Sequence, residues 1–198
     1  LFRSNITISR AVPIALAVVF GFCAVAMIGI MVYFSCIDTE TDLGSFERII
    51  RFNDIWGTHR GFMWIRSIWI FGDASFIEKL FGVGPDMFYS AFSPYFDDLS
   101  KYGDSSTNAA HNEYLNYLIT IGITGLLSYL AIVCGTIKNA VKYAKENPML
   151  IACVSAVICY AVQAVVNLYQ PITTPLFFIF IALCEAFVRN AKAEKSAV

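Results

Sequence analysis

The sequence predicts an all-α, polytopic membrane protein, and its composition and hydropathy pattern both support this fold class. Of 198 residues, 58% are hydrophobic and 15% are charged, whereas soluble domains carry about 45–50% apolar and about 25% charged residues. A helix needs about 20 apolar residues to cross a bilayer core. We therefore expect four spans, over residues 12–34, 111–137, 149–168 and 173–188, and a large loop over 35–110 that contains short interfacial helices.

The first apolar stretch, Val12 to Phe34, is interpreted as a retained membrane span. It carries no charged residue, and it is longer than the apolar region of a signal peptide. The chain begins at Leu1 rather than at a methionine, and four spans are few for an integral membrane enzyme. We therefore expect residues 1–198 to be a single membrane domain that forms the C-terminal part of a larger protein.

Short segments rich in lysine and arginine lie before the first predicted span, between the second and third, and after the fourth. Their basic residues are Arg3, Arg10, Lys138, Lys142, Lys145, Arg189, Lys192 and Lys195. Because short cytoplasmic segments are enriched in lysine and arginine, we expect these flanks in the cytoplasm and the loop over 35–110 outside. The net charge of −1 and the lack of a basic run argue against nucleic acid as a partner. Five of the six cysteines fall within predicted spans, so no disulfide framework or zinc spacing is expected.

The outer loop begins with two segments of helical pattern. Residues 43–53 suit a short amphipathic helix in which Glu47 and Arg51 pair at i and i+4, either as a solvated surface pair or with Arg51 available to a substrate. Residues 58–72 are apolar around most of a helix but too short to span, which predicts an interfacial or protein-buried helix. Arg60 and Arg66 interrupt it about 240° apart, so one regular helix cannot readily direct both at one ligand. Either arginine could instead reach lipid phosphates.

The rest of the loop is richer in glycine and polar residues. The segment Phe81 to Asp86 predicts a structural turn, since glycine permits unusual backbone angles and Pro85 ends a helix; a dinucleotide fingerprint would need a third glycine and a strand before it. Residues 93–108 are typical of an irregular, mobile loop. Their aspartates match no calcium-loop spacing, and we expect them to be solvated.

His111 is the candidate catalytic residue. With Asn108 as the expected N-cap, His111 falls in the first turn of the second span. The positive end of the helix dipole favours neutral imidazole, which can accept a proton, and the same helix end attracts anions such as phosphate. The alternative is a capping or interfacial histidine. His59 is expected to face water.

Three motifs carry a resemblance to a known family. The pair His111-Asn112, followed after nine residues by Gly122-Ile123-Thr124-Gly125, resembles the signature of the O-antigen ligase family. The segment Arg60-Gly61-Phe62-Met63-Trp64 resembles the family's arginine motif, with Trp64 in place of the usual leucine or other apolar residue. Phe81 to Pro85 resembles the glycine turn between them.

The resemblance implies a metal-independent, inverting glycosyltransferase of the ligase or polymerase kind, with no cofactor. Such an enzyme lies in the bacterial inner membrane with its site facing the extracytoplasmic side. It takes a glycan from an undecaprenyl-pyrophosphate carrier and joins it to an acceptor glycan or lipid during synthesis of lipopolysaccharide or other cell-envelope polysaccharides. Ligase and polymerase share these motifs, so the resemblance does not separate them.

The resemblance also implies roles for individual residues. Arg60 would grip the pyrophosphate through charged hydrogen bonds, and His111 would act as general base. Asn112 would orient the histidine or bind sugar, while Arg66 and Arg51 are further substrate-binding candidates. Another arginine of the family would lie before Leu1. No metal ligand is expected.

Two other classes of function remain open on composition alone. A polysaccharide transporter or flippase would also have several spans, yet the spans here contain almost no ionisable residue apart from Glu185, and ion-coupled pathways usually need such groups. A non-catalytic sensor or assembly protein is the second alternative. The histidine motif and its spacing from Arg60 favour the enzyme over both.

Overall fold

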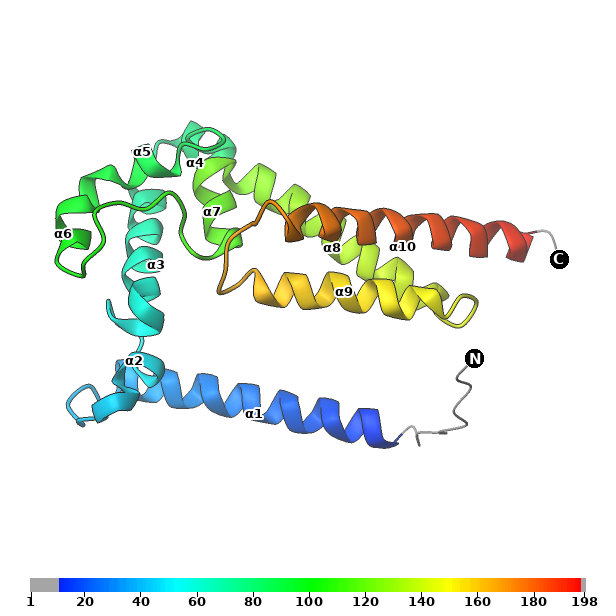
Figure 1. Ribbon diagram of the computed structural model, residues 1–198, viewed down its shortest axis with the longest axis horizontal. Helices are drawn as coiled ribbons and strands as arrows, with labels where there is room; N and C mark the ends of the chain where they lie inside the picture. The colour runs from blue at the N-terminus through cyan, green and yellow to red at the C-terminus, as the bar shows by residue number, and fades with distance from the viewer. Residues whose placement is uncertain (1–10, 197–198) are drawn as a thin grey trace. The chain divides into compact units, whose positions relative to one another are not determined.

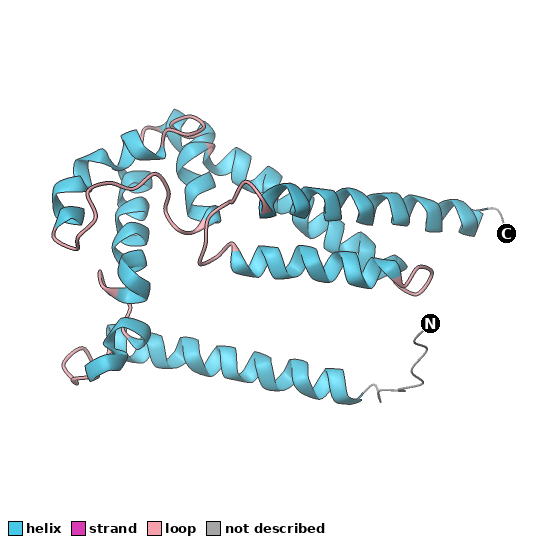
Figure 2. Ribbon diagram, in the orientation of Figure 1, coloured by secondary structure: helices cyan, strands magenta, loops and turns pink. Residues whose placement is uncertain are grey.

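The computed structural model describes residues 11–196, which form helices and loops and, within this range, no strand (Figure 2). The elements in chain order are α1 (Ala11–Cys36), η1 (Gly44–Phe46), α2 (Glu47–Ile50), α3 (Trp56–Asp73), α4 (Phe76–Phe81), α5 (Phe88–Phe92), η2 (Ser93–Tyr95), α6 (Phe96–Ser100), α7 (Glu113–Thr120), α8 (Gly122–Tyr143), α9 (Met149–Gln163) and α10 (Thr173–Ser196). The all-α prediction is confirmed. The basic residues Arg3 and Arg10 lie outside the described residues.

Within residues 11–196, two helices are long and apolar enough to cross a membrane. They are Val18–Cys36, which belongs to α1 and has 19 residues, and α8, which has 22 residues. Helix α9 is apolar but has only 15 residues, fewer than the roughly 20 needed for a span. The 24-residue helix α10 carries charged residues toward its C-terminus.

The chain divides into two compact units, residues 1–61 and 62–198. In the first unit, α1 is followed by the short helices η1 and α2, and backbone and side-chain hydrogen bonds tie this segment to the end of α1. The backbone N–H of Phe52 donates to Oγ of Ser35 at 2.7 Å. The indole Nε1 of Trp56 donates to the carbonyl of Ile49 at 2.9 Å.

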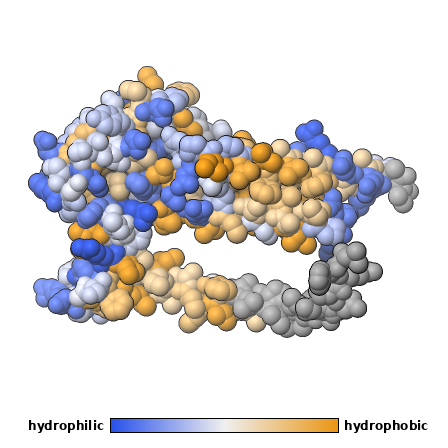
Figure 3. Space-filling view, in the orientation of Figure 1, coloured by the Kyte–Doolittle hydropathy of each residue, from blue (hydrophilic) through white to orange (hydrophobic). Residues whose placement is uncertain are grey.

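The second unit contains a bundle in which α8, α9 and α10 pack along one another (Figure 1). Its buried side chains fall into two clusters. One contains Ala140, Leu150, Cys153, Val154, Cys184 and Val188, and the other contains Tyr129, Val133, Val157 and Phe177. Hydrophobic side chains also cover much of the bundle's outer surface (Figure 3). An apolar exterior over an apolar core is expected of helices that face lipid.

A third core holds the helices of the loop region together. Phe62 of α3, Phe88 and Phe92 of α5 and Leu99 of α6 are each buried to 1% exposure or less. The expectation of an irregular loop over residues 93–108 is therefore wrong for its first part, which forms η2 and α6. The reason is tertiary, since burial of Leu99 beside Phe92 stabilises short helices that would be marginal alone.

The predicted second span is interrupted between α7 and α8. Gly122 has a φ of 68° and Gly82, in the turn after α4, has a φ of 78°. A Cβ at Gly122 would strike the carbonyl of Leu80, and one at Gly82 would strike the carbonyl of Thr120. This approach satisfies the last carbonyls of α7, because Val83 N–H donates to Ile119 O at 2.9 Å and Gly84 N–H to Thr120 O at 3.0 Å.

Candidate functional site

His111 follows a short buried segment, Ala109 and Ala110, that leads into α7. Ala109 and Ala110 are 3% and 0% exposed, and His111 itself is half-buried with a φ of 50°. Asn112 is the N-cap of α7, because its side-chain oxygen accepts from Leu115 N–H at 3.0 Å. The prediction that Asn108 caps the helix is therefore wrong. His111 precedes the cap rather than lying in the first helical turn.

A cavity of about 500 Å³ opens beside His111. It is lined by Met63, Tyr89, Leu99, Asp104, Ser106, Thr107, Asn108 and His111. Hydroxyl, amide and carboxylate groups thus face the same space as the imidazole. Asp104, which the sequence assigned to solvent, is one of them. The arrangement can admit a hydroxylated molecule within reach of a proton acceptor.

Glu113, the residue after the histidine-asparagine pair, was not predicted from the sequence as part of the site. It is 1% exposed, and its N–H donates to Ala164 O at 2.9 Å. Tyr160 donates to its Oε2 at 2.9 Å and Tyr129 to its Oε1 at 3.3 Å. A lone carboxylate at the start of an apolar helical pattern was the available signal, because buried carboxylates need hydrogen-bonding partners.

Arg60 lies in the first unit, directly after a left-handed turn. Gly57, Thr58 and His59 have φ values of 58°, 60° and 66° inside α3, so the regular helix expected from residue 58 begins later. Nη1 of Arg60 donates to Gly57 O at 3.2 Å. Its Nε is buried and, among the described residues, donates to none. Arg60 therefore retains hydrogen-bonding capacity for a ligand.

Gly61, next to Arg60, is required by a close backbone approach. A Cβ at this position would strike the carbonyl of Asn53. The arginine motif therefore has two parts: Gly61 permits close packing against the backbone of Asn53, and Arg60 supplies a positive charge.

Arg66 lies on α3 within the second unit, against aromatic rings. Its guanidinium carbon is 4.3 Å from the ring centroid of Phe62 and 4.6 Å from that of Trp69, which is cation–π geometry. The hydrogen bond and charge of Lys101, with a smaller contribution from the charge of Arg66, lower the pKa of Asp98. These contacts support a packing role for Arg66 in addition to any contact with substrate.

Arg51 is held by several acceptors within the first unit. Nη1 donates to both carboxylate oxygens of Glu47 at 2.8 Å, Nε donates to Phe34 O at 3.0 Å and Nη2 donates to Thr41 O at 2.8 Å. The predicted Glu47–Arg51 pair is confirmed. Because each of its nitrogens is engaged, the geometry favours a structural role for Arg51 over contact with a substrate.

The comparisons with known proteins identify the family. No curated protein and no solved structure matches the chain significantly. The sequence model of a family described as O-antigen ligase matches residues 3–130, which is more than half of the chain and includes Arg60, His111 and Gly122. The chain therefore belongs to the O-antigen ligase family, whose members act in surface polysaccharide synthesis.

Proposed function

We propose that this protein is an inner-membrane glycosyltransferase that moves a glycan from an undecaprenyl-pyrophosphate carrier to a hydroxyl of an acceptor, as an O-antigen ligase or a polysaccharide polymerase. The observation that carries the proposal is the position of His111. This histidine lies within the residues that the family model matches, in a pair that resembles the family's histidine-asparagine signature, and it lines a cavity with several polar side chains.

His111 serves as general base in the proposed reaction. The imidazole takes the proton of the acceptor hydroxyl while the hydroxyl oxygen attacks the anomeric carbon of the donor. The bond from that carbon to the phosphate oxygen breaks, and undecaprenyl pyrophosphate leaves with the bonding electrons. Direct attack inverts the anomeric configuration. General base catalysis of this kind contributes typically about 10²- to 10⁴-fold in rate.

Arg60 stabilises the leaving pyrophosphate in this proposal. A guanidinium forms paired, charged hydrogen bonds with phosphate oxygens, and such bonds offset the negative charge that develops there without a divalent metal. The buried Nε of Arg60, which donates to no described residue, supports this role.

Asn112 acts on the histidine through the backbone. Its side chain is occupied as the cap of α7, so it fixes where the helix starts and hence where His111 is presented. Of the remaining arginines, Arg66 is the better candidate for a contact with the donor, because Arg51 is fully engaged within its own unit.

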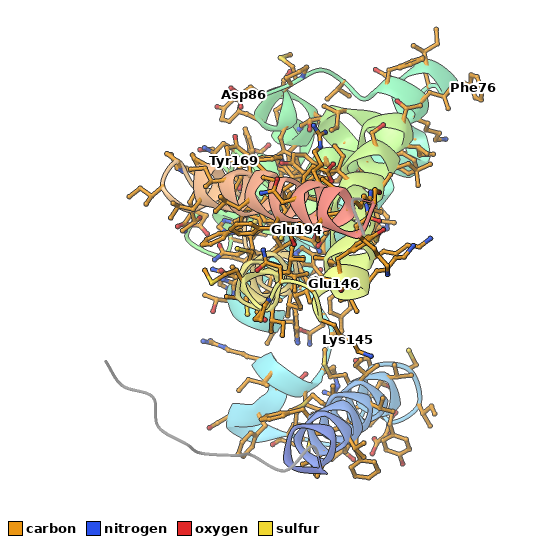
Figure 4. The ribbon with its side chains drawn as sticks, turned by 90° about the vertical axis from the view of Figure 1, so that its right-hand side faces the viewer. Phe76, Asp86, Lys145, Glu146, Tyr169 and Glu194 are labelled. Atoms are coloured by element: carbon orange, nitrogen blue, oxygen red, sulfur yellow. The ribbon has the colours of Figure 1, made fainter. Side chains whose placement is uncertain are left out.

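A topology with cytoplasmic basic flanks fits the three predicted spans of the second unit. Lys195 at the end of α10 lies 3.7 Å from Glu146, between α8 and α9, and Lys142 and Lys192 both lie over the ring of Tyr143. Lysines therefore gather at one end of the bundle, the end that faces the viewer in Figure 4. Helix α7, which begins two residues after His111, packs with Tyr129 in the other half of the bundle. This separation supports an extracytoplasmic site.

Donor turnover by the full-length protein in liposomes tests the proposed function. The assay supplies lipid-linked glycan and a panel of acceptors, with no added metal. We expect His111→Ala to lower turnover by about 10²-fold or more and Arg60→Ala to abolish most of it. His59→Ala, which changes the other histidine, is expected to retain activity. The acceptor that is used separates ligase from polymerase.

The general-base role is wrong if folded His111→Ala protein turns over at the wild-type rate. If wild-type protein transfers no glycan but moves lipid-linked glycan across the bilayer, the transporter alternative replaces the enzyme.

A further inference from the structure

A second cavity, of about 380 Å³, lies next to the His111 cavity. Its walls come from the second unit: the turn after α4 with the start of α5, the segment before α7, helix α7, and the connection from α9 with the start of α10. The residues that matter here are Asp86, Asn108, Asn116, Tyr117, Tyr169 and Thr174. Because Asn108 lines both cavities, a ligand in the second cavity lies beside the proposed reaction centre.

Asn116 supplies the observation that points to a ligand. The residue is 5% exposed and lines the cavity, yet its Oδ1 accepts no hydrogen bond from any residue that the structure describes. The neighbouring hydroxyl of Thr120 donates to the backbone carbonyl of Asn116 at 2.8 Å instead. A buried acceptor without a donor is costly, so Oδ1 of Asn116 is suited to receive a hydroxyl from a bound molecule.

The other walls of the cavity offer further acceptors and ring faces. Tyr169 donates its hydroxyl to Oδ1 of Asp86 at 3.3 Å, and both residues lie on the same side of the bundle in Figure 4. Burial, with a smaller contribution from Asp86, raises the pKa of Tyr169, so its phenol stays protonated. Tyr117 adds an aromatic ring. Aromatic faces beside carboxylate and amide oxygens suit a ring that has apolar faces and hydroxyl edges.

The charge of the cavity excludes the carrier's pyrophosphate. No lysine or arginine is among its lining residues in the described part of the chain, and Asp86 makes it negative. Its size is within the roughly 300–1,000 Å³ of small-molecule sites. A neutral, hydroxyl-rich ring fits this chemistry better than a phosphate does.

We propose that this cavity is a subsite for one neutral sugar ring of the glycan substrate, held by Asn116 and Asp86 against Tyr117 and Tyr169. This assignment rests on the proposed glycosyl transfer, which would place the ring next to His111. The ring can belong to the donor glycan or to the acceptor glycan, since both present the same hydroxyl chemistry.

Saturation-transfer NMR on the full-length protein in lipid nanodiscs tests the subsite directly. Nanodiscs are needed because alkyl maltoside detergents themselves present sugars. The probes are the methyl pyranosides of glucose, galactose, mannose, N-acetylglucosamine and rhamnose. We expect ring protons of at least one probe to receive saturation, and Asn116→Leu to weaken that signal at least tenfold. Asn139→Leu, on α8, is the matched control and is expected to bind as wild type does.

Asp86→Asn provides a second variant in case Asn116→Leu does not fold. Asp86 has a φ of 62°, which asparagine tolerates, so the turn is preserved while the charge is removed and one acceptor oxygen becomes an NH2 donor. We expect binding to weaken at least threefold. The subsite is wrong if no probe receives saturation, or if folded variants bind as tightly as wild type.

Two further measurements separate this subsite from the proposed reaction. His111→Ala is expected to retain saturation transfer while it loses turnover, so the two assignments can fail independently. In the liposome assay, Asp86→Asn is expected to raise one KM by at least threefold with kcat nearly unchanged. A raised acceptor KM assigns the ring to the acceptor, and a raised donor KM assigns it to the donor glycan; two unchanged KM values overturn the subsite.

Discussion

The two halves of the α8–α10 bundle are built from the same three helices but are held together differently. The near half is the half that packs against α7, close to His111. There Tyr129 and Tyr160 donate to the buried carboxylate of Glu113. In the far half, the core consists of aliphatic side chains and cysteines such as Leu150 and Cys184. The near half therefore depends on directional hydrogen bonds and the far half on shape and apolar burial.

The half that is held by directional hydrogen bonds is also the half next to the proposed site. Tyr160 pairs with Thr174 at 2.7 Å, and Thr174 lines the proposed sugar cavity. Glu113 follows Asn112, which caps the helix after His111. One polar network thus connects the histidine segment with the wall of the second cavity. Such networks specify a single arrangement when every member is satisfied, whereas apolar cores tolerate substitutions that conserve volume.

Removal of the Glu113 carboxylate is expected to have the largest effect on stability. Glu113→Ala leaves the buried hydroxyl of Tyr129 without this acceptor, at about 1–3 kcal/mol, and costs less at half-buried Tyr160, which keeps its hydrogen bond with Thr174. Leu150→Met in the far half conserves volume and is expected to cost less than about 1.5 kcal/mol. Thermal unfolding in nanodiscs, followed by circular dichroism, measures both.

Glu113→Gln refines the same comparison, because an amide oxygen can still accept one tyrosine hydroxyl. We expect it to unfold between wild type and Glu113→Ala. Equal midpoints for Glu113→Ala and Leu150→Met would show that the near half does not depend on its polar network.

The glycine contact at the start of α8 gives the next largest effect. Gly122→Ala forces a Cβ against the Leu80 carbonyl at a φ of 68°, which we expect to destabilise the protein by about 1–3 kcal/mol. Gly135 is the matched control, because a Cβ there meets nothing within 4 Å. Gly135→Ala is expected to stabilise helix α8 by about 0.5–1 kcal/mol. Opposite shifts in unfolding midpoint check the pair, and two shifts of the same sign would contradict it.

Much of the fold and part of the candidate site could be predicted from the sequence. Apolar stretches predicted helices α1 and α8, and the charge spacing predicted the Glu47–Arg51 pair. The break at Gly122 could not be predicted, because its cause is the turn at Gly82, forty residues earlier in the chain.

The cap before α7 was misplaced for a similar reason. Asn108 and Asn112 both precede an apolar helical pattern, and local sequence does not separate them. Ala109 and Ala110 are buried and His111 has a left-handed backbone, so the helix begins only after Asn112. The second cavity could not be predicted from the sequence either, because Asp86, Asn116 and Tyr169 come from three separate segments.

Loss of the capping box of α4 in acid is expected to give the smallest effect on stability. Helix α4 packs against α7 and α8, so this loss tests how far the near half depends on α4. Ser75 and Glu78 form a capping box at the start of α4, with Ser75 N–H donating to Glu78 Oε2 at 2.8 Å. Hydrogen bonds from the side chain and then the backbone of Ser75 lower the pKa of Glu78 below its ordinary value of 4.5. The contribution of this pair to stability is therefore fully present above about pH 4.5 and is lost as the pH falls through the lowered folded-state pKa. Both Glu78→Gln and Ser75→Ala should flatten the stability profile below pH 4.5, measured by thermal unfolding across a pH series. If stability falls with decreasing pH equally in both variants and in wild type, the capping box does not contribute to the stability of the contact between α4 and the α7–α8 junction.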